Sequence, residues 1–168
     1  MEAKARLLGH PIHQMLIVLP LGLLIAAWAA DVAYFAGVRN VLGQVGYWNT
    51  AGGIMSGLVA AVFGFIDWIG VPIGSRAKRI GAWHAGFNVT VLLLFAVSLV
   101  IRHPLTAHVP NLLSFVCATV GLLLAGISGW LGGELVNRLG VGVSPGANVN
   151  APSSLSGEPA SPAPQTEK

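Results

Sequence analysis

Residues 112–133 read LLSFVCATVGLLLAGISGWLGG, an apolar run that contains no charged side chain. Its length matches the roughly 20 residues that an α-helix needs to cross a hydrocarbon core of about 30 Å. In lipid, backbone N–H and C=O groups must be paired inside the segment, because no water is present to pair them. The run therefore predicts a transmembrane helix.

Three further apolar stretches lie upstream, at residues 13–38, 47–70 and 81–101. The composition agrees with four membrane spans: 54% of the 168 residues are hydrophobic and only 9% are charged, whereas soluble domains carry about 25% charged residues. So few ionised groups cannot cover a soluble domain of this length. We therefore expect an all-α protein, a four-helix transmembrane bundle over residues 1–143, with the lipid bilayer as its surroundings.

The two ends of the chain differ from this apolar part. Residues 144–168 are rich in Pro, Ser, Gly and Ala and have no periodic apolar face, so we expect a disordered tail. At the other end, Lys4 and Arg6 precede the first apolar run, and residues 27–29 read A-W-A. A cleaved signal peptide is therefore an alternative for this run. The run is long for a signal peptide, which favours a membrane span.

The basic residues are distributed unevenly between the two sides of the expected bundle. Four helices place the N-terminus, the second loop and the C-terminal segment on one side, which holds seven of the nine cations, while the other holds Arg39 and Arg102. The positive-inside rule makes the richer side cytoplasmic, so we expect a multi-pass protein of the inner membrane with both termini in the cytoplasm. There is no dense basic patch interleaved with aromatics, which argues against a nucleic-acid partner.

Two pairs of ionisable residues share one spacing. His13 precedes Asp31 by 18 residues, and His84 precedes Arg102 by 18. Eighteen residues make five helical turns, so each pair lies on one face of its helix. Ionisable residues at membrane depth usually turn inward and pair. We therefore predict that His13 faces His84 and that Asp31 forms an ion pair with Arg102.

A shared motif points in the same direction. The second and fourth apolar stretches both contain G-x-x-x-W-x-G, at residues 64–70 and 126–132. Together with the shared spacing, this indicates a duplicated helical hairpin whose pseudo-twofold axis runs along the membrane normal. Coincidence in a sequence built from few residue types is the alternative.

Polar residues of the spans gather toward the cytoplasmic ends of the helices: His10, His13, Asp67, His84, Asn88 and Glu134. A b-type haem needs two imidazoles that face each other across a bundle. We expect His13 and His84 to be the axial pair, with Asp67 or Asn88 orienting an imidazole.

Two other interpretations stay open for these residues. A non-haem metal, iron or zinc, would be held by His10, His13, His84 and a carboxylate. In the third interpretation the groups are structural: His10 caps the first helix, His84 and Asn88 hydrogen-bond across helices, and Asp67 pairs with a loop cation. No Ser/His/Asp or Cys/His arrangement suggests a hydrolase, so an enzyme is the less favoured class.

The motifs taken in order resemble a known family. They are G-H-P-I-H at residues 9–13, L-x-V-L-P-L-G-L-L at 16–24, G-F-I-D-W at 64–68 and G-W-L-G-G-E-L-V-x-R-x-G-V-G-V at 129–143. This order and spacing resemble a bacterial membrane protein family catalogued as domain of unknown function 2231. The resemblance implies a four-helix membrane domain. Fusion of some relatives to Rieske-type iron–sulfur or c-type cytochrome domains hints at electron transfer to a redox partner protein.

The sequence departs from the family pattern at three positions. Gln14 replaces the second proline of H-P-x-H-P, and Asn137 and Leu139 replace the tyrosine and histidine of L-V-Y-R-H-G. These changes weaken any metal site that uses the fourth helix, and they leave His13 and His84 in place. We expect an accessory redox module with haem b. The alternative is a cofactor-free membrane scaffold or small transporter-like bundle with structural or proton-handling histidines.

Overall fold

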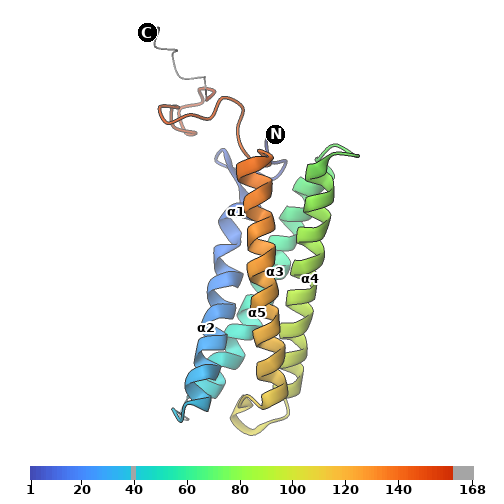
Figure 1. Ribbon diagram of the computed structural model, residues 1–168. Coiled ribbons are helices and arrows are strands. Elements are labelled where there is room, and N and C mark those ends of the chain that lie inside the picture. The colour runs from blue at the N-terminus through green and yellow to red at the C-terminus, as the bar shows by residue number, and fades with distance from the viewer. Residues whose placement is uncertain (39–40, 161–168) are drawn as a thin grey trace.

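The computed structural model describes residues 1–38 and 41–160, and over these residues it confirms the expected all-α bundle of four long apolar helices. Figure 1 shows these helices side by side. A short hairpin of β1 (Arg6–Leu7) and β2 (His10–Pro11) precedes them. The helices and their short extensions follow in chain order: α1 (Ile12–Leu16), α2 (Val18–Phe35), α3 (Leu42–Ile69), α4 (Arg76–Arg102), η1 (Thr106–His108), α5 (Leu112–Gly133) and η2 (Glu134–Arg138).

Each of the four spans is long and apolar enough to cross a membrane: Ile12–Phe35, Leu42–Ile69, Arg76–Arg102 and Leu112–Arg138. The second and third begin five residues before the positions expected from hydropathy, at 42 instead of 47 and at 76 instead of 81. Ser75 explains the earlier start of α4, because its side chain accepts a hydrogen bond from the Lys78 backbone and caps the helix. Capping residues are polar, so a search for apolar runs misses the first helical turn.

The helices pack as two hairpins, α1 and α2 against α3, and α4 against α5. The core between the hairpins contains Leu24, Val91, Phe95 and Ala118, and Phe95 is completely buried. Gly121 makes this packing possible, because a Cβ atom there would lie 2.9 Å from the Phe95 ring. Small residues permit such close approach in lipid, where no hydrophobic effect drives helices together.

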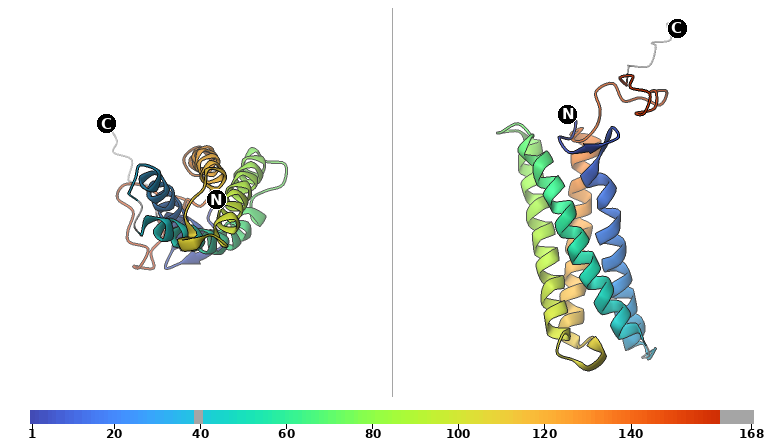
Figure 2. Two further views of the ribbon diagram at one scale, coloured as in Figure 1. Left: turned by 90° about the horizontal axis from the view of Figure 1, so that it is seen from below. Right: turned by 180° about the vertical axis from the view of Figure 1, so that it is seen from behind.

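The bundle has two distinct ends (Figure 2). One end carries the N-terminus, the β-hairpin and the α3–α4 connection, and we call it the terminal end. The helices α2 and α4 finish at the opposite end, which we call the loop end. The described part of the expected tail, residues 144–160, contains no helix or strand and lies beyond the terminal end. The rest of the expected tail, residues 161–168, lies outside the described residues.

Candidate functional site

The two histidines predicted to face each other do so near the terminal end. His13 lies on α1 and His84 on α4, on different hairpins. Their ring centroids are 6.3 Å apart, and the two planes are almost perpendicular, at 89°. Both side chains are partly buried. The shared 18-residue spacing therefore does place the two imidazoles together across the bundle.

Each imidazole is held by a backbone carbonyl of the other helix in its hairpin, α3 for His13 and α5 for His84. His13 Nδ1 donates to the Ala60 carbonyl at 2.8 Å, and His84 Nδ1 donates to the Ser128 carbonyl at 2.9 Å. A carbonyl oxygen can only accept, so Nδ1 must carry the hydrogen in both rings. In the neutral ring this leaves a lone pair on Nε2. Asn88 uses this lone pair, because its Nδ2 donates to His84 Nε2 at 3.0 Å.

A glycine lies four residues beyond each of these carbonyls. A Cβ atom on Gly64 would lie 2.9 Å from the His13 ring, and one on Gly132 would lie 3.3 Å from the His84 ring. Each ring therefore lies directly against the backbone of the neighbouring helix. Ala60 and Gly64 of α3 correspond in this way to Ser128 and Gly132 of α5.

This correspondence corrects the register of the repeat inferred from G-x-x-x-W-x-G. That motif pairs Gly64 with Gly126, whereas the histidine contacts pair Gly64 with Gly132, six residues further on. A Cβ atom on Gly126 would meet nothing within 4 Å. Six residues are not a whole number of helical turns, so the two alignments place different faces of the helices in register.

Two other expected site residues do not join the pair. His10 lies in β2, is exposed, and its Nε2 forms a hydrogen bond with Ser154 Oγ at 3.2 Å. Asp67 Oδ1 accepts from the Ala5 backbone N–H at 2.9 Å, so this carboxylate fixes the N-terminal segment. Within the described residues no group of three or more His, Cys, Asp or Glu side chains could hold a metal ion. The structure therefore does not bring His10 to the histidine pair, and the interpretation of His10 as a helix cap is wrong, since Pro11 occupies that position.

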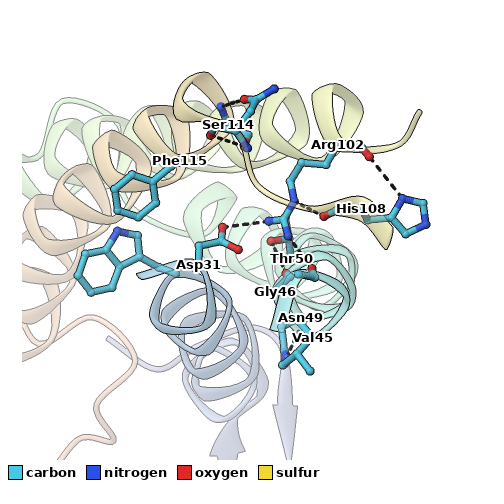
Figure 3. Close-up of polar contacts among 12 residues, drawn as sticks. Asp31, Val45, Gly46, Asn49, Thr50, Arg102, His108, Ser114 and Phe115 are labelled. Carbon is cyan, nitrogen blue, oxygen red and sulfur yellow. Dashed lines mark hydrogen bonds and ion pairs between the residues drawn. The ribbon is translucent and has the colours of Figure 1, made fainter. Parts of the chain in front are cut away.

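The ion pair predicted at the other end of the same helices is present (Figure 3). Arg102 Nη1 donates to Asp31 Oδ2 at 2.9 Å, and the two side chains are 0% and 1% exposed. Arg102 also donates from Nε to the His108 carbonyl at 2.9 Å and from Nη2 to the Gly43 carbonyl at 2.7 Å. One guanidinium thus joins α2, α3, α4 and the loop after α4.

Sequence reasoning missed the groups that surround this ion pair. Gly46 borders the Asp31 carboxylate so closely that a Cβ atom there would overlap it. Tyr47 stacks on His108 with ring centroids 4.1 Å apart, and its hydroxyl bonds His103 Nδ1 at 3.0 Å. The acceptors of Arg102 are mostly backbone carbonyls, which carry no signal in the residue pattern. The Asp31 Oδ1 atom is buried without a hydrogen-bond partner among the described residues.

The four helices that are long and apolar enough to span a membrane agree with the description of one protein family. A family model described as "Predicted membrane protein (DUF2231)" matches residues 9–145. The match covers most of the chain, including all four spans, and leaves out most of the C-terminal tail. The chain therefore belongs to this family of integral membrane proteins. Comparison with curated proteins and with solved structures gives no match.

Proposed function

We propose that this protein is a non-enzymatic accessory redox module of the inner membrane that binds one b-type haem between His13 and His84. The observation that carries the proposal is the pair itself: two imidazoles from different hairpins, with ring centroids 6.3 Å apart, and each anchored through Nδ1. Haem supplies four equatorial nitrogens, so two axial imidazoles complete its ligand set. A site with only two protein ligands is therefore sufficient for haem and insufficient for most other metals.

The donor set fits this role. An imidazole that donates Nδ1–H to a carbonyl has a fixed orientation and a more basic Nε2, which is how proteins prepare histidine ligands. The Ala60 and Ser128 carbonyls provide this anchor for His13 and His84 respectively. Binding would require Asn88 to turn away, because its Nδ2 now donates to His84 Nε2.

When bound, the haem would supply one-electron transfer. The chain's own residues would hold and orient the two imidazoles and exclude water from them. With the terminal end in the cytoplasm, as the distribution of cations favours, the electron would pass to a redox partner protein at the cytoplasmic face.

The test is the visible spectrum of the full chain purified in detergent, oxidised and dithionite-reduced. We expect a Soret band that is lost in His13→Ala and in His84→Ala. His10→Ala is the matched control, because within the described residues the side chain of this exposed histidine hydrogen-bonds only to Ser154. It should keep the band. A colourless protein after expression with ample haem would overturn the proposal.

A second function is favoured by the hydrogen bonds of His84. Both of its ring nitrogens already have protein partners, the Ser128 carbonyl and the Asn88 amide. A cofactor-free membrane scaffold or small transporter-like bundle would use the histidines in this way, for helix packing or proton movement. The same purified protein distinguishes the two functions. If the second function is correct, the protein is colourless and elemental analysis finds neither iron nor zinc. His84→Ala then lowers its melting temperature, because the ring's hydrogen bonds hold the helices together.

A further inference from the structure

Three cations lie together where α4 begins at the terminal end, and two of them are engaged within the chain. Arg76 Nη2 forms an ion pair with Glu134 Oε1 at 2.7 Å. Lys78 Nζ lies 3.8 Å from the centre of the Trp68 ring and donates to the Trp68 carbonyl. The third cation, Arg79, is exposed, and its guanidinium has no hydrogen bond or ion pair with any residue in the described ranges.

One turn further along α4 a shallow groove opens on the outer surface of the bundle. It has a volume of about 250 Å³ and is lined by Trp83, Gly86, Phe87 and Thr90. The Trp83 and Phe87 rings, 6.4 Å apart, form aromatic walls. A Cβ atom on Gly86 would meet nothing within 4 Å, so this part of the groove is open. The Thr90 hydroxyl donates to the Gly86 carbonyl and offers no free donor.

Arg79 and the groove lie on one stripe of the helix. At 100° per residue, Gly86 and Thr90 lie within about 20° of Arg79 around the axis, and Trp83 lies within about 40°. Thr90 is about 16 Å from Arg79 along the axis at 1.5 Å per residue. From the helix end toward the middle of the span, the stripe therefore presents a cation, then an indole, then an apolar groove.

We propose that this stripe is a binding site for one anionic phospholipid, with the headgroup phosphate on Arg79 and an acyl chain in the Trp83–Thr90 groove. A guanidinium binds phosphate oxygens in a bidentate manner. Tryptophan favours the depth at which headgroups meet acyl chains. Anionic lipids are attracted to basic residues at the cytoplasmic face, the side to which the distribution of cations assigns the terminal end.

A second groove shows by contrast what the charge adds. It lies at Trp28, Thr119, Leu122 and Leu123 and is of similar size, about 180 Å³, but no cation is among its lining residues. An acyl chain of any lipid can lie there, without selection of a headgroup. The Arg79 stripe combines both elements, so it should prefer one class of lipid.

The test is native mass spectrometry of the full chain in detergent, titrated with dioleoyl phosphatidylglycerol or dioleoyl phosphatidylcholine. We expect one phosphatidylglycerol to be retained more tightly than phosphatidylcholine. Arg79→Gln should weaken phosphatidylglycerol binding about fivefold, since one basic residue near an anionic surface contributes about that factor. Arg138→Gln is the control, because Arg138 is also exposed on η2. Equal losses in Arg79→Gln and Arg138→Gln would overturn the proposal.

Two further arms examine the groove. Gly86→Leu should fill it and weaken lipid retention, whereas Gly126→Leu, at an exposed and equally open glycine of α5, should not. Inorganic phosphate at the same concentration should not compete with phosphatidylglycerol, because the acyl chain contributes to binding. Full competition by phosphate, or equal behaviour of the two leucine variants, contradicts a lipid site at this groove.

Discussion

At both ends of the bundle, polar side chains connect the first span to α4, but the two ends use different chemistry. At the loop end, Asp31 and Arg102 join α2 to α4 as a fully buried ion pair, and three nitrogens of the guanidinium have acceptors. At the terminal end, His13 and His84 bring the same pair of spans together as two partly buried rings. A charge in lipid is tolerated only when it is paired, so the loop end is a fixed connection. Neutral imidazoles can keep a lone pair for other chemistry.

The largest effect should come from breaking the ion pair on one side. Arg102→Leu leaves the Asp31 carboxylate buried without a partner and removes the donors to the Gly43 and His108 carbonyls. We expect a loss of about 3–5 kcal/mol in the free energy of unfolding, measured by denaturant unfolding in detergent. Arg138→Leu, at an exposed position, is the control. Similar stability of the two variants would mean that the pair does not hold the loop end.

The double variant Asp31→Leu with Arg102→Leu sharpens this prediction. Removing both charges leaves no unpaired buried ion, and replacing such pairs by apolar residues is often neutral. We expect the double variant to be more stable than Arg102→Leu alone in the same unfolding measurement. If it is less stable, the guanidinium contributes mainly through its backbone carbonyl bonds and not through Asp31.

An intermediate effect is expected from the glycine that lies against the ion pair. A Cβ atom on Gly46 would overlap the Asp31 carboxylate, which Arg102 holds in place. Gly46→Ala should therefore cost about 1–3 kcal/mol of stability, as overpacking usually does. Gly129→Ala is the control, since its Cβ atom would meet nothing within 4 Å. Identical melting temperatures for the two variants would contradict tight packing at the loop end.

The smallest effect should come from the hydrogen bond between Asn88 and His84. Asn88→Ala removes one partly buried side-chain bond, and such bonds inside membranes are worth about 0.6 kcal/mol on average. Thr90→Ala is the control, because that hydroxyl donates to the Gly86 backbone carbonyl and not to a histidine. We expect Asn88→Ala to be slightly less stable than Thr90→Ala. A loss as large as that of Arg102→Leu would show that the histidine end is as rigid as the ion-pair end.

The sequence predicted the parts of both sites that follow from helical periodicity. His13 with His84, and Asp31 with Arg102, were expected to meet because 18 residues complete five turns, and the structure contains both contacts. Asn88 was expected beside His84, which lies one turn away, and it is bonded there. His10 and Asp67 were expected to act on the imidazoles, but His10 lies in the non-helical β-hairpin and bonds Ser154, and Asp67 of α3 accepts from the non-helical N-terminal segment at Ala5. Non-helical segments have no fixed period from which such positions could be calculated.

By itself, the sequence determined that the chain crosses the membrane four times and which polar residues share a helix face. The reason is that span length and helical period are local properties of the chain, set by bilayer thickness and backbone geometry. Only the tertiary structure decided the register between hairpins, with Gly64 corresponding to Gly132, and the carbonyls that hold His13, His84 and Arg102. Those features depend on which backbones approach each other, and every residue carries the same carbonyl group.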